Sequence, residues 1–201
     1  MAFRVLPADD PSLTPTEDLA VAVAQLREAE VEGAEVEASR AQVLAFVAAH
    51  PDAAHRTNPE AHLTGSALVV DPVRGRTLLM LHRKLGRWFQ PGGHADGDAN
   101  LAAVALREAT EETGVAGLQV VVPAIDVDVH RVEPPAEGPH LHLDSRFLVL
   151  SPAGAAEVGN EESLALRWVG LSELDDLDPP IDPGTRRLVA RGLAVAAELG
   201  G

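Results

Sequence analysis

The sequence has no cysteine among its 201 residues, and basic residues are scarce. The first absence excludes disulfide bonds, thiolate nucleophiles and zinc-thiolate sites. Lysine and arginine number 16 against 31 aspartates and glutamates, which gives a formal net charge of -15 at pH 7. Such a charge repels nucleic-acid backbones, so we expect no DNA or RNA polymer as a partner. A small phosphorylated substrate is compatible with this charge if a cation and a local basic patch assist.

Long apolar runs are also missing from the chain. No run is long enough to span a bilayer, so we expect no membrane partner. The N-terminus, Met-Ala-Phe-Arg-Val-Leu-Pro followed by acidic residues, lacks a signal-peptide profile. These absences favour a soluble, cytoplasmic protein. With 46% hydrophobic residues, the length suits one domain plus an appendage.

A glycine turn followed by one helix, residues 92–115, is the most informative stretch. Asn100 is a suitable N-cap, residues 101–113 are good or neutral helix formers, and Gly114 can adopt the left-handed conformation that closes a helix. The sequence therefore predicts a helix with marked ends at 101 and 113.

Three carboxylates cluster on that predicted helix. Glu108, Glu111 and Glu112 stand at i, i+3 and i+4, so they share one face and repel one another. A solvated surface is one explanation for such a cluster. The other is a cation site, because hard ions such as Mg²⁺ and Mn²⁺ take carboxylate, carbonyl and water oxygens.

The spacing of these residues resembles the Nudix box, G-x5-E-x7-R-E-U-x-E-E-x-G-U, where U is a bulky aliphatic residue. The fixed residues that match are Gly93, Arg107, Glu108, Glu111, Glu112 and Gly114. Two positions depart from the pattern: Ala109 replaces a bulkier aliphatic residue, and Ala99 replaces the first glutamate. Asp98 and Asp96, one and three residues before Ala99, carry carboxylates that could take a similar place.

The resemblance implies the roles of the box residues. Glu111 and Glu112 would hold the metal, Mg²⁺ or Mn²⁺, with the Gly92 carbonyl as a further ligand. Glu108 would serve as a ligand or as the general base, and Arg107 would orient a neighbouring glutamate. The implied reaction is hydrolysis of a diphosphate linkage in a nucleoside diphosphate joined to another group.

The resemblance also implies an α/β fold, the Nudix-type α/β/α sandwich, over roughly residues 62 to 199. Hydrophobic patterning predicts helices at about 14–30, 34–49 and 183–199, and strands at 66–70, 77–82, 118–129 and 141–150. The first of these helices would use Thr14 as its N-cap and Pro15 at its first position. We therefore divide the chain into a helical extension, residues 1–60, and a Nudix domain, residues 61–201. The extension could serve packing, homodimer formation or a lid.

The densest basic cluster immediately precedes the glycine turn. Arg83, Lys84 and Arg87 either hold substrate phosphate or are ordinary surface charges. Trp88 lies next to them, and we expect it to serve the core rather than to stack on a substrate, because large aromatics mostly serve packing.

Two further groups are candidates for auxiliary roles. His140, His142 and Asp144 alternate along a predicted strand, so they share one face and either bind a transition metal or line the exposed side of an edge strand. His94, just inside the box, has the same two explanations. Glu161 or Glu162 resembles the acidic residue that reaches the metal or positions water in many Nudix domains.

Two alternatives to a hydrolase follow from the same sequence. Ala99 motivates a nucleotide-sensing or scaffold module with weakened catalysis. The histidine-rich strand motivates an isomerase that acts on prenyl diphosphates. A screen for phosphate release separates the hydrolase from both alternatives. The sensing module would bind one nucleotide tightly without turnover, whereas the isomerase would move a double bond without releasing phosphate.

Overall fold

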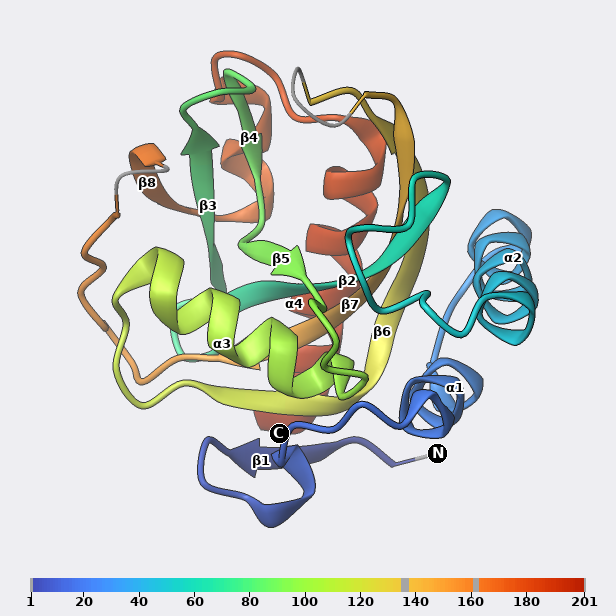
Figure 1. The fold of residues 1–201 in the computed structure, drawn as a ribbon. Coiled ribbons are helices and arrows are strands. Elements are labelled where there is room, and N and C mark those ends of the chain that lie inside the picture. Colours follow the sequence, from blue (N-terminus) through green and yellow to red (C-terminus); the bar gives the residue numbers. More distant parts are fainter. Residues whose placement is uncertain (1, 135–137, 161–162, 201) are drawn as a thin grey trace.

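The computed structural model describes residues 2–134, 138–160 and 163–200, so Glu161 and Glu162 lie outside the described residues. Within these ranges eight strands form one sheet in the order β1-β6-β7-β2-β3-β4, with β5 paired to β2 and β8 paired to β3 (Figure 1). The strands are β1 (Arg4–Pro7), β2 (Ala61–Asp71), β3 (Arg76–His82), β4 (Arg87–Phe89), β5 (Gly92–His94), β6 (Gln119–Val132), β7 (His140–Leu150) and β8 (Ser163–Val169). The α-helices are α1 (Leu19–Glu28), α2 (Ala34–Ala49), α3 (Leu101–Thr113) and α4 (Pro183–Gly200), with short 3₁₀ helices at Pro11–Leu13 and Leu171–Asp176.

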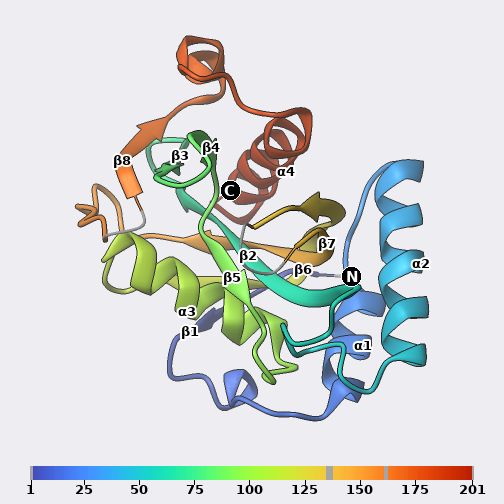
Figure 2. The ribbon, with the colours of Figure 1, turned by 45° about the horizontal axis from the view of Figure 1, so that its top comes forward.

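Two apolar cores lie on opposite faces of the sheet. Along β2, Leu63, Ala67 and Val69 belong to the core under α3, whereas Leu68 and Val70 belong to the core under α4. This alternation follows from the two-residue period of a strand. Figure 2 shows α3 and α4 on either side of the central strands. The α/β/α sandwich is therefore confirmed.

Helix α3 lies very close to the sheet. A Cβ atom on Gly65 of β2 would lie 2.8 Å from the carbonyl oxygen of Leu101. Glycine is needed at this position because that contact is with backbone, which cannot rotate away. The close approach brings the acidic half of α3 next to β5, which pairs with β2 through Gly65 and Gly93.

The first helix differs from its prediction. It begins at Leu19, with Asp18 as N-cap, and not at Thr14, which instead follows the 3₁₀ helix. The Asp18 carboxylate accepts a hydrogen bond from the N–H of Ala20 at 3.0 Å. The placement of Thr14 as the N-cap is therefore wrong, because Asp18 supplies the cap four residues later.

The N-terminal segment also contributes a strand that the hydrophobic pattern did not predict. β1 pairs antiparallel with β6, with Arg4 opposite Val122 and Pro7 opposite Gln119. Helices α1 and α2 contact β6 as well, and Figure 1 shows them beside that strand. The extension therefore packs directly on the main sheet.

Strand β7 lies inside the sheet, between β6 and β2. His140 and Asp144 on this strand are 6% and 1% exposed. The alternative that these residues line the exposed side of an edge strand is therefore wrong. Among the helices that the structure describes, none is long and apolar enough to cross a membrane.

Candidate active site and an adjoining histidine cluster

Helix α3 has the ends that its sequence predicts. The Asn100 side chain accepts a hydrogen bond from the N–H of Ala103, and Gly114 closes the helix with φ of 63°. The three glutamates near its C-terminus differ in exposure, since Glu112 is 5% exposed and Glu111 is exposed.

Gly92 and Gly93, which the sequence placed in a turn, instead form part of strand β5, because they pair with β2. Two of these carboxylates lie against them. The N–H of Gly92 donates to Oε2 of Glu112 at 2.9 Å. A Cβ atom on Gly93 would lie 2.4 Å from Oε2 of Glu108, so only glycine leaves space for that carboxylate. Strand β5 therefore holds Glu112 by a hydrogen bond from Gly92, and it accommodates Glu108 because Gly93 has no side chain.

Arg107 connects three parts of the site. Its Nη2 donates to Oε1 of Glu108 at 3.1 Å and to the carbonyl oxygen of His94 at 3.3 Å. Its Nη1 lies 3.8 Å from Oδ2 of Asp98. Such an arrangement orients the Glu108 carboxylate through a charge-assisted hydrogen bond.

The residues near the missing box glutamate contact the N-terminal segment. Ala99 is fully buried, and its N–H donates to the carbonyl oxygen of Thr16 at 2.6 Å. The Asp98 carboxylate accepts the N–H of Thr16 at 3.1 Å, while Asp96 forms an ion pair with Arg56. These contacts between the box and residues 16 and 56 were not apparent in the sequence, because they join segments far apart in the chain.

The basic cluster lies on the hairpin of β3 and β4. Arg83, Lys84 and Arg87 are exposed, and Nη2 of Arg83 donates to the carbonyl oxygen of Ser163 at 3.2 Å. The hairpin tip lies at the far end of β4 from the glycine turn (Figure 1). Trp88 is 6% exposed and its indole N–H donates to the Asp178 carbonyl at 3.1 Å, which confirms its place in the core.

A cluster of histidines lies beside the glycine turn. His62 on β2 is opposite His142 on β7, which is opposite His130 on β6, so three neighbouring strands carry histidine in one row. His140 lies two residues before His142, and His94 on β5 pairs with β2 two residues from His62. His94, His140 and His142 were candidates from the sequence, whereas His62 and His130 were not, because only strand pairing brings them into the cluster.

The rings of this histidine cluster are in contact. His62 lies 4.9 Å from His94, 4.7 Å from His140 and 5.1 Å from His142, measured between ring centroids. One ligand atom from each of His62, His94 and His142 can be chosen so that all three lie within 4.8 Å of one another. Burial, and then the neighbouring histidines, lower the pKa of His142 to about 3, so its imidazole is neutral at pH 7.

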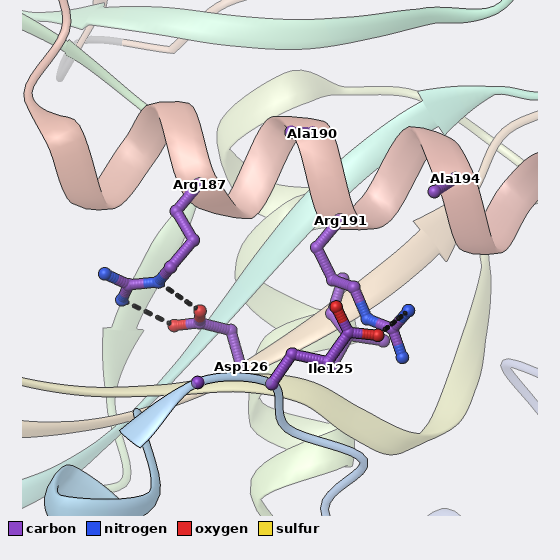
Figure 3. Close-up of a pocket in the computed structure, with 8 residues that line it drawn as sticks. Ile125, Asp126, Arg187, Ala190, Arg191 and Ala194 are labelled. Atoms are coloured by element: carbon purple, nitrogen blue, oxygen red, sulfur yellow. Dashed lines mark hydrogen bonds and ion pairs between the residues drawn. The ribbon is translucent and has the colours of Figure 1, made fainter. Parts of the chain in front are cut away.

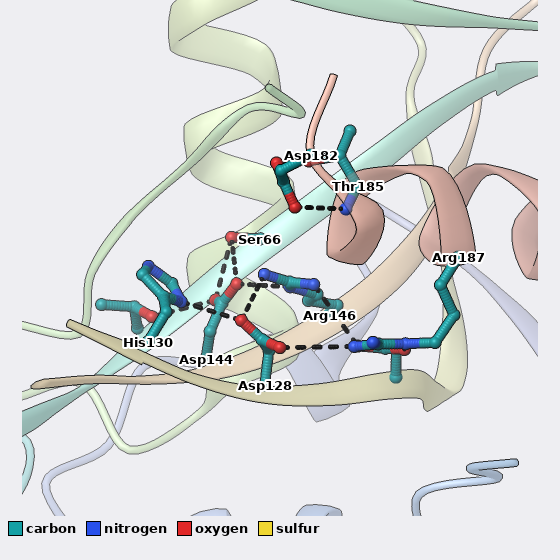
Figure 4. A network of polar contacts seen from close by, with 10 residues as sticks. Ser66, Asp128, His130, Asp144, Arg146, Asp182, Thr185 and Arg187 are labelled. Carbon is teal, nitrogen blue, oxygen red and sulfur yellow. Dashed lines mark hydrogen bonds and ion pairs between the residues drawn. The ribbon is translucent and has the colours of Figure 1, made fainter. Parts of the chain in front are cut away.

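Asp144 takes part in a different network (Figure 4). Its carboxylate accepts hydrogen bonds from the hydroxyls of Thr64 and Ser66 and from Nε of Arg146, at 2.8 to 2.9 Å. Burial opposes ionisation, but chiefly the charge of Arg146 holds the pKa of Asp144 below its usual range. Asp144 is therefore already an acceptor in an ion-pair network, and the three-residue set with His140 and His142 is not a shared ligand group.

Arg146 extends this network across β6. It is 5% exposed and also contacts the carboxylates of Asp126 and Asp128, which Arg187 of α4 contacts in turn. The carboxylates raise the pKa of the Arg146 guanidinium despite its burial. The network joins α4 to the sheet beside the histidines.

A pocket of about 460 Å³ lies between α4 and β6, away from the box (Figure 3). Its charged lining residues pair with one another: Arg187 with Asp126 at 2.8 Å, and Arg191 with Glu32 at 2.7 Å. No box residue lines this pocket, so we do not assign the reaction to it.

Comparisons with known proteins agree with this geometry. The family model described as NUDIX domain matches residues 61–192. A NUDIX-family hydrolase from Clostridium perfringens has 19% identity and a TM-score of 0.51, covering 69% of this chain and 97% of that one. An Ap4A hydrolase of C. elegans has 16% identity and a TM-score of 0.54, with coverages of 68% and 98%. A Nudix hydrolase from M. smegmatis, RenU, has 24% identity and a TM-score of 0.51, with coverages of 69% and 87%.

These structural neighbours, at such identities, establish the fold alone. No curated protein sequence matches the chain. The family model covers more than half of the chain, and the carboxylates of its box lie against its glycine turn. The chain therefore belongs to the NUDIX domain family, with the fold and the box of a Nudix-type pyrophosphohydrolase.

Proposed function

We propose that this chain hydrolyses a diphosphate linkage in a nucleoside diphosphate joined to another group, and that the reaction depends on a divalent cation. The observation that carries the proposal is the placement of Glu108 and Glu112 against Gly93 and Gly92. Two carboxylates held beside these glycines, on the same helix face as the exposed carboxylate of Glu111, are suited to a cation.

The donor set fits a hard cation. Glu111, Glu112 and Glu108 offer carboxylate oxygens, and the Gly92 carbonyl offers another, which are the ligands that Mg²⁺ and Mn²⁺ prefer. Glu112 accepts the N–H of Gly92 through Oε2 at 2.9 Å, which fixes the position of its carboxylate. When bound, such a cation offsets the negative charge of the phosphate oxygens.

The side chains around this donor set have proposed roles of their own. Glu108 takes a proton from the attacking water, and Arg107 keeps its carboxylate oriented through the 3.1 Å hydrogen bond. Arg83, Lys84 and Arg87 hold substrate phosphate if the substrate extends toward the β3–β4 hairpin. Because the chain carries a net charge of -15, a phosphorylated substrate needs this local positive charge.

A nucleotide-derived substrate is supported by the structural neighbours. One of them is an Ap4A hydrolase. The missing first glutamate, at Ala99, favours the nucleotide-sensing module as the second candidate. In that case the carboxylates hold a cation, the cation binds the phosphates of a nucleotide, and the nucleotide is not cleaved efficiently.

A substrate screen tests the proposal. Purified protein is incubated with dinucleotides, nucleoside triphosphates and nucleotide sugars, with and without Mg²⁺ or Mn²⁺, and the products are separated by chromatography. We expect cleavage of a diphosphate linkage that stops on adding a chelator. No turnover on any compound, combined with tight binding of one nucleotide by calorimetry, would support the sensing module instead.

A further inference from the structure

We propose that His62, His94 and His142 form a second metal site, for a transition-metal ion of the Zn²⁺ class, separate from the carboxylate site of the box. The proposal rests on the position of three imidazoles from three different strands. They come from β2, β5 and β7, which the sheet holds in fixed register.

The spacing of the three side chains is close to that of a metal site. One ligand atom from each lies within 4.8 Å of the other two. With Zn–N bonds of about 2.0–2.1 Å, two nitrogen ligands of one tetrahedral ion lie about 3.3 Å apart. The ligand atoms therefore need to close by at most roughly 1.5 Å on binding, a shift that side-chain rotation can supply without moving the strands.

The chemistry of the donors selects the ion. Imidazole nitrogens suit Zn²⁺, Ni²⁺, Cu²⁺ and Co²⁺, whereas Mg²⁺ prefers oxygen. The carboxylate nearest in sequence to His142 is that of Asp144, and it already accepts hydrogen bonds from Thr64, Ser66 and Arg146. The site therefore differs in kind from the glutamate cluster of α3.

A further nitrogen donor adjoins the three. His140 is 6% exposed, its Nδ1 lies 3.0 Å from the Gly138 carbonyl, and its ring centroid lies 4.7 Å from that of His62. Its Nε2 is buried, and no hydrogen-bond partner for it occurs among the residues described. A carbonyl oxygen can only accept, so this contact orients the ring with Nδ1 toward Gly138 and leaves Nε2 as the nitrogen that would bind a metal.

The site would restrain the strand that holds the glycine turn. His94 follows Gly93 directly, and its carbonyl oxygen accepts a hydrogen bond from Arg107. An ion bound to His94, His62 and His142 joins β5 to β2 and β7 through side chains as well as through backbone. We therefore expect the bound ion to raise the melting temperature of the protein.

The experiment uses full-length protein without a histidine tag, stripped with a chelator and then dialysed. Zn²⁺ binding is measured by calorimetry and Co²⁺ binding by visible absorption, in the presence of excess Mg²⁺ to occupy oxygen sites. We expect one equivalent of each ion, and Co²⁺ bands that indicate nitrogen ligands. Absence of binding under these conditions would overturn the proposal.

Variants locate the site. His142→Gln and His94→Gln should weaken Zn²⁺ binding by about 100-fold or more. Mutation of a residue that only hydrogen-bonds to a metal ligand typically lowers affinity by about 10–100-fold, and removal of the ligand itself should lower it further. His55→Gln, an exposed histidine outside the cluster, is the matched control and should bind as the wild type does. Circular dichroism of the metal-free variants checks that they fold; His62 is 1% exposed, so it is not used.

A box variant separates this proposal from the proposed function. Glu111→Gln should retain the Co²⁺ spectrum, and loss of the spectrum would mean that the ion binds the carboxylates instead. Unchanged affinity in both histidine variants would equally refute the site. Failure of Mg²⁺-dependent hydrolysis, with the Co²⁺ result intact, would refute only the proposed function.

Discussion

Gly92 donates its backbone N–H to the Glu112 carboxylate at 2.9 Å, which ties β5 to the end of α3. The two residues are twenty positions apart, and they belong to the strand and the helix of the Nudix box. His94 lies on the same three-residue strand, and its ring contacts His62. The strand β5 therefore adjoins the carboxylates through its backbone and the histidine cluster through a side chain.

Removing one carboxylate charge tests the proposed cation site. Glu111→Gln should abolish Mg²⁺-dependent turnover, because it removes an anionic ligand while keeping the shape of the side chain. Glu111 is exposed, so the melting temperature should remain near that of the wild type. Glu198→Gln, at an exposed site on α4, is the control. Wild-type turnover in the Glu111 variant, measured by product chromatography, would show that the assignment is wrong.

Two glycine variants separate the geometry of the site from stability. Gly93→Ala places a methyl group 2.4 Å from the end of the Glu108 side chain, which can rotate away, so we expect lost activity in a folded protein. In Gly65→Ala the added methyl group would lie 2.8 Å from the carbonyl oxygen of Leu101. Overpacking of this kind lowers the free energy of unfolding by about 1–3 kcal/mol. Urea unfolding of both variants, together with activity, measures the difference. Equal loss of stability in the two would contradict this account.

Asn100 joins the start of α3 to the N-terminal segment. Its amide nitrogen donates to the carbonyl oxygens of Ser12 and Thr14, and its oxygen accepts from Gln25. Asn100→Ala should lower the free energy of unfolding by about 2 kcal/mol, since a cap and buried hydrogen bonds are lost together. Limited proteolysis should also cut residues 12–18 faster. The exposed Gln42→Ala serves as the comparison, and equal proteolysis rates in both would reject the link.

Asp71 makes stability depend on pH. Burial alone would raise its pKa, but backbone N–H groups of Gly154, Arg74 and Val73 donate to the carboxylate and lower the pKa below the usual value of 3.8. A lowered folded-state pKa means that the stabilisation is present above the unfolded value and is lost as the pH falls through the folded value. Asp71→Asn should therefore cost about 1.5–3 kcal/mol at pH 7 and progressively less in acid.

Urea unfolding of wild type and Asp71→Asn from pH 7 to pH 2.5 measures this dependence. The exposed Asp9→Asn is the control. A difference between wild type and the Asp71 variant that stays constant across this range would contradict the ionisation argument.

The box helix was predictable because its signals are local. Asn100 and Gly114 lie within one turn of the helix that they close, and the glutamate spacing depends only on the helical period. The N-terminal segment was less predictable. Both Thr14 and Asp18 suit an N-cap, and the choice of Asp18 depends on contacts that Thr14 and Thr16 make with the box.

The sequence by itself determined the acidic helix and the alternation of the long strands, since each depends on neighbours a few residues away. Gly92 and Gly93 read as a turn in the sequence, and pairing with β2 makes them a strand. Only the tertiary structure decided that β7 is buried and that His62, His94 and His142 meet. Those residues are separated by 32 and 48 positions along the chain, and the pairing of β5 and β7 with β2 brings them together. Strand order and register are set by which apolar faces pack on α3 and α4, and no local pattern records that choice.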